Sequence, residues 1–437
     1  MSFVRKGLGF GAGQLIIAGG SFLTGIIFAR GLGPNGMGQY ALLQTTALFA
    51  ATFAALGLGP STVYFLNNRK VPVDIVTTIT LKFCFWWGSA VCIGIALLVS
   101  TAEGFFGRFP IWIVALFGLG VGAQFSVGIV RQLLTARLAV RPVLWLDLLR
   151  VLALFVPALV LALLGLLTVE VAVSILSAAS FVRLAYALPM VWQDFRFTIP
   201  FDCRLLLRIF NYGVKLSAAN LLYLLSLEVA MLVLRHLMND DFAPIGIYSR
   251  AVSLCGLIAV LPRALGPLLF AKWSEPENSK TGSQIEATLR VMNTYGLAAF
   301  AGILLFGEEL IVTLYGREFL GARGPLTILA LSTVCVSDFI VLTRVLAGTG
   351  RVRITILISS IAVGIIVATT YILVPNVGIA GAAVATLIGS AFSTSAAFFA
   401  CAQVFGVRVR KSVFVSKSDL AAIVDACCVS LKSLSLK

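Results

Sequence analysis

Charged side chains recur in or beside long apolar stretches of this sequence, where an isolated charge is costly. Five arginines in such places are candidates for binding an anion: Arg30, Arg183, Arg250, Arg263 and Arg344. A guanidinium offers several N–H donors in one plane and stays charged at physiological pH, which suits phosphate groups. Because a charge at membrane depth costs about 3 kcal/mol or more, such residues usually face a cavity. These arginines therefore predict an internal cavity that binds an anion.

A polar stripe follows one apolar stretch, residues 209–236. At about 100° per residue on a helix, Ser217, Glu228 and Arg235 fall within about 20° of one another, and Asn220 lies about 60° away. We expect Asn220 and Glu228 to line the cavity and Arg235 to lie at an outer gate. Glu228 would balance charge or carry a proton. Hydrogen bonding between helices is the structural alternative for the same stripe.

Three further polar residues complete the candidate set: Gln14, Gln124 and Asp338. We expect the two glutamines to line the cavity and Asp338, like Glu228, to be a polar or coupling group within it. Small and polar helix faces also arise where helices pack together, so packing is an equal alternative for both glutamines.

Pairing between helices competes with a cavity role for several arginines. Arg183 and Arg344 fit either a cavity lining or an interhelix ion pair. Arg150 follows Asp147 by three residues, so an ion pair within one helix, or extension of the side chain to the membrane surface, explains it as well as a function does.

The composition identifies the elements that must position these side chains. Of 437 residues, 59% are hydrophobic and 12% are charged, whereas soluble domains carry about 25% charged residues. Apolar runs of about 20 residues, each long enough to cross a bilayer, recur along the whole chain. The sequence therefore predicts an all-α polytopic membrane protein with about twelve transmembrane helices.

The net charge of +15 fits membrane topology better than nucleic-acid binding. Lys and Arg gather in alternate connections when the N-terminus is placed in the cytoplasm, as the positive-inside rule requires, which predicts that both termini are cytoplasmic. We expect an N-terminal six-helix lobe at 1–195, a cytoplasmic linker at 196–208, a C-terminal six-helix lobe at 209–406 and a basic cytoplasmic tail at 407–437.

The stretch "FARGLGPNGMGQYALL" (28–43) contains G-x-G-x-x-G, the pattern of a dinucleotide-binding loop. That loop needs a preceding strand, whereas here an apolar span precedes it, and Pro34 removes one backbone N–H from the supposed phosphate cradle. We expect a tight turn between two spans, in which glycine supplies a positive φ.

Nothing in the sequence indicates catalysis. The single histidine, His236, has no partner carboxylate at ligand spacing, and neither a phosphate-binding loop nor a nucleophile elbow occurs. We expect no enzyme activity and no cofactor, with coupling to H⁺ or Na⁺ left open.

A weak internal repeat relates the two halves of the chain. "FARGLGPNGMGQYALL" resembles "LRHLMNDDFAPIGIYSRA" (234–251). The corresponding positions are Arg30 with Arg235, Gly38 with Gly246 and Tyr40 with Tyr248. Parallel repeats of this kind are related by an axis along the membrane normal, with the transported substrate between the halves.

With these motifs and "VLAGTGRVRITILISSIAVGIIVATTYILVPNVGIAGAAVATLIGSAF" (345–392), most of residues 1–406 resembles bacterial polysaccharide flippases of the Wzx type. These belong to the multidrug/oligosaccharidyl-lipid/polysaccharide exporter superfamily. The resemblance implies two six-helix lobes, related by pseudo-two-fold symmetry, around a central cavity. It also implies transport of an undecaprenyl-pyrophosphate-linked oligosaccharide across the bacterial inner membrane, for O-antigen or exopolysaccharide synthesis.

The implied partners are a lipid-linked oligosaccharide, membrane lipids, a polysaccharide polymerase and a chain-length regulator, with no nucleic acid. Two alternatives within the superfamily are a cation-coupled multidrug antiporter and a lipid II flippase. The antiporter should show clustered deep carboxylates, which are sparse here, and the lipid II branch typically has two further spans. A membrane enzyme would need a long external loop or an acidic catalytic pair.

Overall fold

A computed structural model describes residues 2–55, 57–67, 71–137, 139–238, 241–273 and 281–407. Every element in these ranges is helical: α1 (Ser2–Ala55), α2 (Leu58–Asn67), α3 (Val73–Thr101), α4 (Glu103–Phe106), α5 (Ile111–Ala136), α6 (Val140–Leu163), α7 (Val169–Trp192), α8 (Cys203–Leu237), α9 (Ala243–Ile258), α10 (Val260–Trp273), α11 (Thr281–Leu314), the 3₁₀ helix η1 (Arg317–Ala322), α12 (Arg323–Gly348), α13 (Val352–Val377) and α14 (Ile379–Phe405). The basic tail expected at 407–437 lies outside the described residues from 408 onward.

The helices are long and apolar enough to cross a membrane about twelve times. Ten in the described ranges meet that test singly, and the bent pair α9–α10 makes an eleventh span. Helix α1, at 54 residues, joins two helices across a kink and so supplies two spans. The chain is a multi-pass membrane protein, as the sequence predicts. A helix suits this setting because all of its backbone hydrogen bonds form within the span.

The turn expected in the glycine-rich stretch is present at Gly33. Its backbone has φ 65° and ψ −179°, and Pro34 begins the next helix. A residue with a side chain is strained at this φ, which explains the glycine. The stretch reverses the chain between two spans, so the dinucleotide-loop alternative has no strand to support it.

Two corresponding spans are broken. The second span changes from α1 to α2 around Gly57, which has φ 82°. The eighth span bends by 52° between α9 and α10. Sharp bends of this kind are tolerated in membranes where neighbouring helices or a polar cavity satisfy the freed backbone groups.

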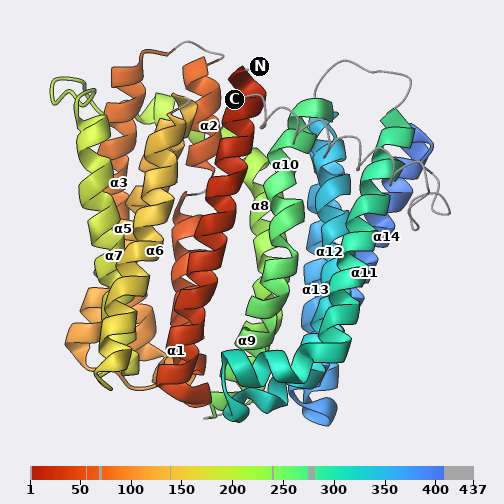
Figure 1. Ribbon diagram of the computed structural model, residues 1–437. Coiled ribbons are helices and arrows are strands. Elements are labelled where there is room, and N and C mark those ends of the chain that lie inside the picture. The colour runs from red at the N-terminus through yellow and green to blue at the C-terminus, as the bar shows by residue number, and fades with distance from the viewer. Residues whose placement is uncertain are drawn as a thin grey trace, which may run out of the picture.

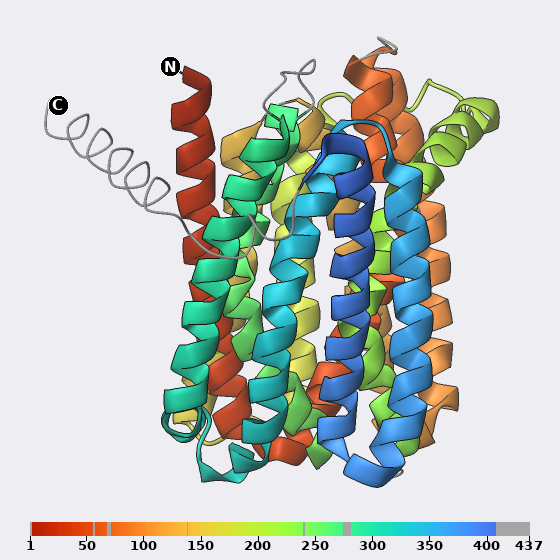
Figure 2. The same ribbon diagram turned by 90° about the vertical axis from the view of Figure 1, so that its right-hand side faces the viewer.

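Figure 1 shows two groups of helices side by side, α1–α7 and α8–α14, and in Figure 2 the second group lies toward the viewer. We call the end of the bundle at which α1 begins the near end and the end that holds Gly33 the far end. The linker expected at 196–208 falls where α7 has ended and α8 begins, and the Asp202 side chain caps α8 by accepting from the N–H groups of Arg204 and Leu205.

The two groups pack closely toward the far end. The largest buried apolar cluster contains side chains from both, including Phe28 of α1, Tyr248 of α9 and Phe319 of η1, each no more than 2% exposed. The backbones of α1 and α9 approach so closely that a Cβ on Gly246 would lie 1.9 Å from the carbonyl oxygen of Pro34. The far end is therefore closed in this structure.

Candidate functional site

A cavity of about 890 Å³ lies between the two groups of helices. Its walls come from α1, α2, α5, α6 and α7 on one side and from α8, α12 and α13 on the other. Lining residues on α1 and α13, such as Gln14 and Val352, lie toward the near end. The volume falls within the range of about 300–1,000 Å³ that is typical of small-molecule sites.

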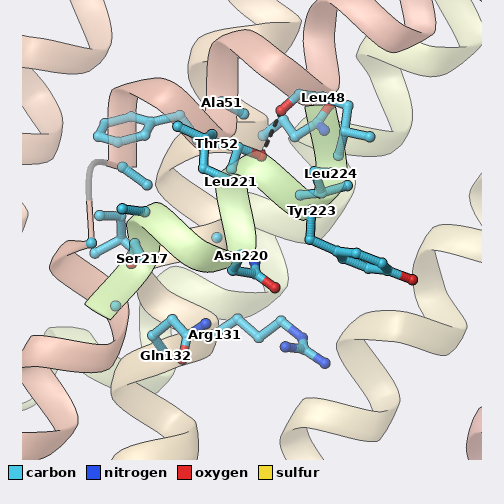
Figure 3. Close-up of a pocket in the computed structure, with 18 of the residues that line it drawn as sticks. Leu48, Ala51, Thr52, Arg131, Gln132, Ser217, Asn220, Leu221, Tyr223 and Leu224 are labelled. Atoms are coloured by element: carbon cyan, nitrogen blue, oxygen red, sulfur yellow. Dashed lines mark hydrogen bonds between the residues drawn. The ribbon is translucent and has the colours of Figure 1, made fainter. Parts of the chain in front are cut away.

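Five of the sequence-predicted site residues line this cavity: Gln14, Gln124, Arg183, Asn220 and Arg344. They come from five different helices. Figure 3 shows Asn220 and Arg131 extending from two separate helices into the same space. The cavity therefore brings together expected residues that lie far apart in the sequence.

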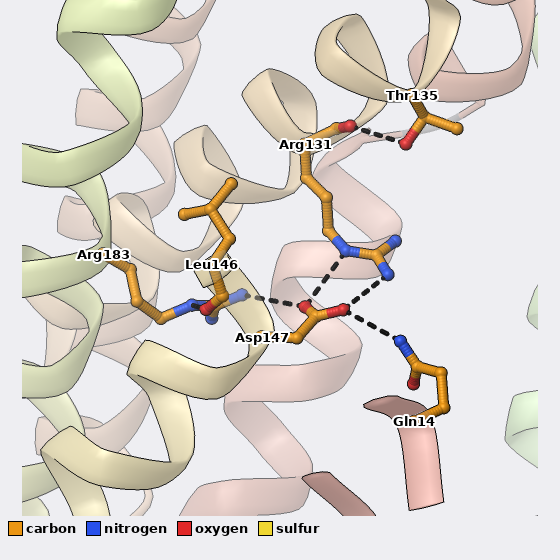
Figure 4. A network of polar contacts seen from close by, with 6 residues as sticks. All are labelled: Gln14, Arg131, Thr135, Leu146, Asp147 and Arg183. Atoms are coloured by element: carbon orange, nitrogen blue, oxygen red, sulfur yellow. Dashed lines mark hydrogen bonds and ion pairs between the residues drawn. The ribbon is translucent and has the colours of Figure 1, made fainter. Parts of the chain in front are cut away.

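The wall formed by α5, α6 and α7 holds a polar network centred on Asp147 (Figure 4). Arg131 donates two hydrogen bonds to this carboxylate, from Nε to Oδ1 at 3.1 Å and from Nη2 to Oδ2 at 2.8 Å. Gln14 Nε2 donates to Oδ2 at 3.3 Å, and Arg183 Nη2 lies 3.9 Å from Oδ1. Fork-shaped pairs between arginine and carboxylate fix both groups in position, so Arg131 is held at the cavity wall.

Arg183 combines the two roles that the sequence left open. It lines the cavity, yet it is only 9% exposed, and its Nε donates to the Leu146 carbonyl at 3.2 Å. The positive charge of Arg183 therefore interacts both with the Asp147 carboxylate and with the Leu146 carbonyl oxygen. Gln14 likewise lines the cavity and bonds across helices.

Arg150 and Arg344 face the cavity from opposite groups of helices, α6 and α12. Both are exposed, and neither has a hydrogen-bond acceptor or ion-pair partner among the described residues. Asp147 pairs with Arg131 across two helices, so the pair within α6 that would explain Arg150 structurally does not form. These two guanidinium groups are available to a ligand.

The cavity carries a marked excess of positive charge. Its described lining includes four arginines and one aspartate, a formal charge of +3. Guanidinium groups in a partly enclosed space favour an anion, and planar donors match the oxygens of a phosphate group. The arrangement can therefore hold a phosphate-bearing ligand.

A second pocket, of about 340 Å³, adjoins the cavity and shares Ser21 with it. Glu228 and Arg263 line this pocket, not the main cavity. The Glu228 carboxylate lies close to the Arg263 guanidinium and to the Thr45 hydroxyl. The structure thus places these two expected site residues, which have opposite charges, in the same pocket.

Arg250 lies outside both linings, at the interface between the two groups. It is 6% exposed, its Nη1 donates to the Gly25 carbonyl of α1 at 3.1 Å, and its guanidinium lies 5.8 Å from the centre of the Tyr315 ring. The cavity role expected for Arg250 does not apply to this conformation, because α1 packs directly on this helix face.

Arg30 and Arg235 lie at the far end. Arg30 Nε donates to the Leu314 carbonyl at 2.9 Å, so it is placed outside the cavity that we expected it to line. Arg235 Nε donates to the Phe105 carbonyl at 2.7 Å, and its guanidinium lies 3.9 Å from the centre of the Phe242 ring. Both arginines reach across from one group of helices to the other.

Asp338 lies apart from both linings, beside Asn293 of α11, with which its side chain hydrogen-bonds. Its Oδ1 atom is buried and accepts no hydrogen bond from any described residue. This acid belongs to the interior of the second group of helices.

Sequence reasoning missed the central role of Asp147 and Arg131. Arg131 shares a helix face with Gln124, which was the available signal, and the two charges are 16 residues apart on consecutive spans. Which neighbouring helix such a face meets depends on the rotation of both helices, which hydropathy does not determine.

Comparison with known proteins agrees with this architecture. A family model described as polysaccharide biosynthesis protein matches residues 3–263. The probable low-salt glycan biosynthesis flippase Agl15 of Haloferax volcanii is 24% identical over 405 residues, covering 90% of this chain and 82% of that protein.

Solved structures of two transporter types share the fold. The lipid II flippase MurJ in an inward closed conformation has a TM-score of 0.73 and 13% identity, covering 97% of this chain and 93% of its own. An inward-facing multidrug resistance MATE family transporter of the MOP superfamily has a TM-score of 0.70 and 14% identity, covering 90% and 94%. The family model spans more than half of the 437 residues, and the chain therefore belongs to the polysaccharide biosynthesis protein family.

Proposed function

We propose that this protein is a flippase that moves a lipid-linked oligosaccharide across a membrane and holds its pyrophosphate in the central cavity. The observation that carries this proposal is the placement of Arg150 and Arg344, which have no hydrogen-bond acceptor or ion-pair partner among the described residues. They face the cavity from opposite sides, and its described lining has a formal charge of +3. The similarity to the probable glycan flippase Agl15 and to the lipid II flippase MurJ supports the proposal that this protein is a flippase.

The near end faces the cytoplasm in this proposal, with both termini on that side. The structure then corresponds to an inward-facing state, in which the cavity lies toward the cytoplasm while the far end is closed. The substrate is an undecaprenyl-pyrophosphate-linked oligosaccharide in the bacterial inner membrane, destined for O-antigen or exopolysaccharide. A polysaccharide polymerase and a chain-length regulator would act after it.

Transport proceeds by alternating access. The pyrophosphate enters from the near end and binds Arg150 and Arg344, with Arg131 and Arg183 supporting the positive potential. Rocking of the two groups of helices then closes the near end and separates the far end. The polyprenyl chain remains in lipid throughout, so only the headgroup crosses the polar path.

Five further candidates divide into two roles in this scheme. Arg30, Arg235 and Arg250 hold the far end closed through their bonds across the interface. Glu228 and Asp338 are the acidic groups through which H⁺ or Na⁺ would couple to the movement.

A multidrug antiporter of the same fold is the second candidate, because a MATE transporter shares the architecture. Organic cations need acidic groups in the cavity, whereas the only carboxylate in the described lining, Asp147, is already neutralised by Arg131. The charge of the cavity favours the anionic substrate.

Transport of a fluorescent polyprenyl-pyrophosphate-linked sugar in proteoliposomes tests the proposal. We expect the double variant Arg150→Ala, Arg344→Ala to lower the flipping rate at least about tenfold, since each charged hydrogen bond contributes about 1.5–3 kcal/mol. The matched control is Arg353→Ala, which removes an exposed arginine at the near end that does not line the cavity. Undiminished flipping in the double variant, or export of cationic drugs without flipping, would refute the proposal.

A further inference from the structure

The second pocket differs from the main cavity in charge. Glu228 and Arg263 are its only charged lining residues among those described, so its formal charge is zero, against +3 in the cavity. It lies beside the cavity and shares Ser21 with it. A ligand held in the cavity by its phosphates could therefore extend a neutral portion into this pocket.

Several hydroxyl groups that line the pocket already donate their protons within the protein. Thr333 Oγ1 donates to the Leu329 carbonyl at 2.8 Å, and Thr386 Oγ1 donates to the Ala382 carbonyl at 3.0 Å. Because the Thr386 proton is used, the Tyr248 hydroxyl must be the donor in their 3.1 Å contact. What these groups still offer a ligand is lone pairs.

Ser332 follows the same pattern. Ser390 Oγ donates to the Leu387 carbonyl at 3.0 Å, so Ser332 Oγ donates to Ser390 in their 2.8 Å contact. Ser332 lines the pocket with its remaining acceptor capacity. In its ionised form the Glu228 carboxylate adds acceptors only, because it then has no proton to donate.

A pocket with many acceptors and no net charge selects a neutral ligand that carries many donors. Sugar hydroxyl groups are such donors, whereas a phosphate would meet the Glu228 carboxylate and lone pairs. Arg263, exposed at the same pocket, supplies donors for the ring and hydroxyl oxygens of the same sugar. The apolar remainder of the wall includes the rings of Phe22 and Tyr248, and a pocket of about 340 Å³ has room for a sugar unit.

We propose that this pocket is a glycan subsite that binds the sugar next to the pyrophosphate through the Glu228 carboxylate and the hydroxyl oxygens of Ser332 and Thr333. The inference rests on the proposed function, because the pyrophosphate in the main cavity brings the sugar to the pocket. Affinity for the anion and affinity for the sugar are thereby assigned to different side chains.

Binding of two probe lipids to purified protein in nanodiscs, without any ion gradient, separates these assignments. One probe is polyprenyl pyrophosphate alone, and the other is the same lipid carrying one neutral hexose. We expect Glu228→Gln to weaken binding of the hexose lipid about tenfold, and Ser332→Ala or Thr333→Val to weaken it by about threefold to tenfold, because each loses a hydrogen-bond acceptor. Affinity for the sugar-free lipid should change by less than about twofold in Ser332→Ala and Thr333→Val. It should not fall in Glu228→Gln, which removes a negative charge beside the cavity.

Ser337→Ala is the matched control, because Ser337 is a buried serine on the same helix whose hydroxyl donates to the Thr333 carbonyl and which lines neither cavity. It should leave both affinities unchanged. Equal weakening of both lipids by the pocket variants, or unchanged binding of the hexose lipid, would overturn the glycan subsite while leaving the anion site standing. A wild-type protein that binds neither lipid would overturn the proposed function and the subsite with it.

Discussion

Arg30 and Arg235, which occupy corresponding positions in the two halves of the sequence, each donate hydrogen bonds to main-chain carbonyls of the opposite group of helices. Arg30 reaches Leu314, the last residue of α11, and Arg235 reaches Phe105 in α4. The C-terminal carbonyls of a long helix such as α11 carry partial negative charge, so Arg30 also meets a favourable dipole. These two reciprocal contacts add to the apolar packing that closes the far end.

Removal of both arginines should favour separation of the far end. In the variant Arg30→Ala, Arg235→Ala, cross-group hydrogen bonds to charged donors are lost, and each such bond contributes about 1.5–3 kcal/mol. Spin labels on cysteines at positions 103 and 318, where exposed Glu103 and Glu318 lie in different groups of helices, report the distance. We expect a longer distance to appear as a major population in double electron–electron resonance.

The control for this experiment is Arg323→Ala, which breaks a far-end ion pair with Glu308 inside a single group of helices. It should leave the distance distribution unchanged. Identical distributions in the double variant and the wild type would show that the two arginines do not hold the far end closed.

A methyl group at Gly246 should also prevent closure, for a steric reason. A Cβ there would lie 1.9 Å from the Pro34 carbonyl oxygen and 2.9 Å from the Gly38 nitrogen, which are backbone atoms that cannot move aside cheaply. We expect Gly246→Ala to populate the longer distance between the same spin labels and to abolish flipping. Gly302→Ala adds the same methyl where nothing lies within 4 Å, and it should behave as wild type. A closed far end in Gly246→Ala would contradict this expectation.

The sequence predicts the fold well because its determinants are local. Span lengths follow from apolar runs, and the positive φ of Gly33 follows from a glycine–proline–asparagine turn between two spans. The repeat correctly relates Arg30 to Arg235, since both lie at the end of a span that meets the other half. Each of these features depends on residues that are close together in the chain.

The site is predicted less well because it depends on how deep each side chain lies along the bundle and on which helices lie opposite it. Ser217, Glu228 and Arg235 share one face of α8, yet Ser217 lines the main cavity, Glu228 lines the second pocket and Arg235 is buried at the far end. A helical wheel gives the face of a side chain but neither its depth nor the helix opposite. The partners of Arg131 and Arg250 lie on other helices for the same reason.

Asp147 should affect stability and anion binding in opposite directions. Asp147→Asn keeps the shape but leaves Arg131 and the mostly buried Arg183 without a counter-charge, and it raises the formal charge of the cavity from +3 to +4. We expect the free energy of unfolding to fall by about 1–3 kcal/mol, since the Asp147 side chain is 15% exposed and only partly screened. Affinity for polyprenyl pyrophosphate should rise by a few-fold.

Thermal unfolding and lipid binding on the same Asp147→Asn sample measure both effects. Arg131→Gln is the complementary variant, because it removes a cation from the same pair and should lower both stability and affinity. A weaker affinity in Asp147→Asn would mean that the carboxylate itself positions the ligand.

Salt should weaken the anion site but leave the glycan subsite nearly unaffected. Arg150 and Arg344 are exposed, so their attraction for pyrophosphate is screened over about 8 Å at physiological ionic strength and about 3 Å at 1 M. The second pocket has no net charge among its described lining residues, and its hydrogen bonds to a sugar do not depend on long-range potential. We therefore expect added NaCl to lower the affinities for the sugar-free lipid and for the hexose lipid in parallel, which binding titrations at low and high NaCl measure. Their ratio, which measures the contribution of the hexose, should stay constant within about twofold, and a ratio that collapsed with salt would mean that the sugar is held through charge.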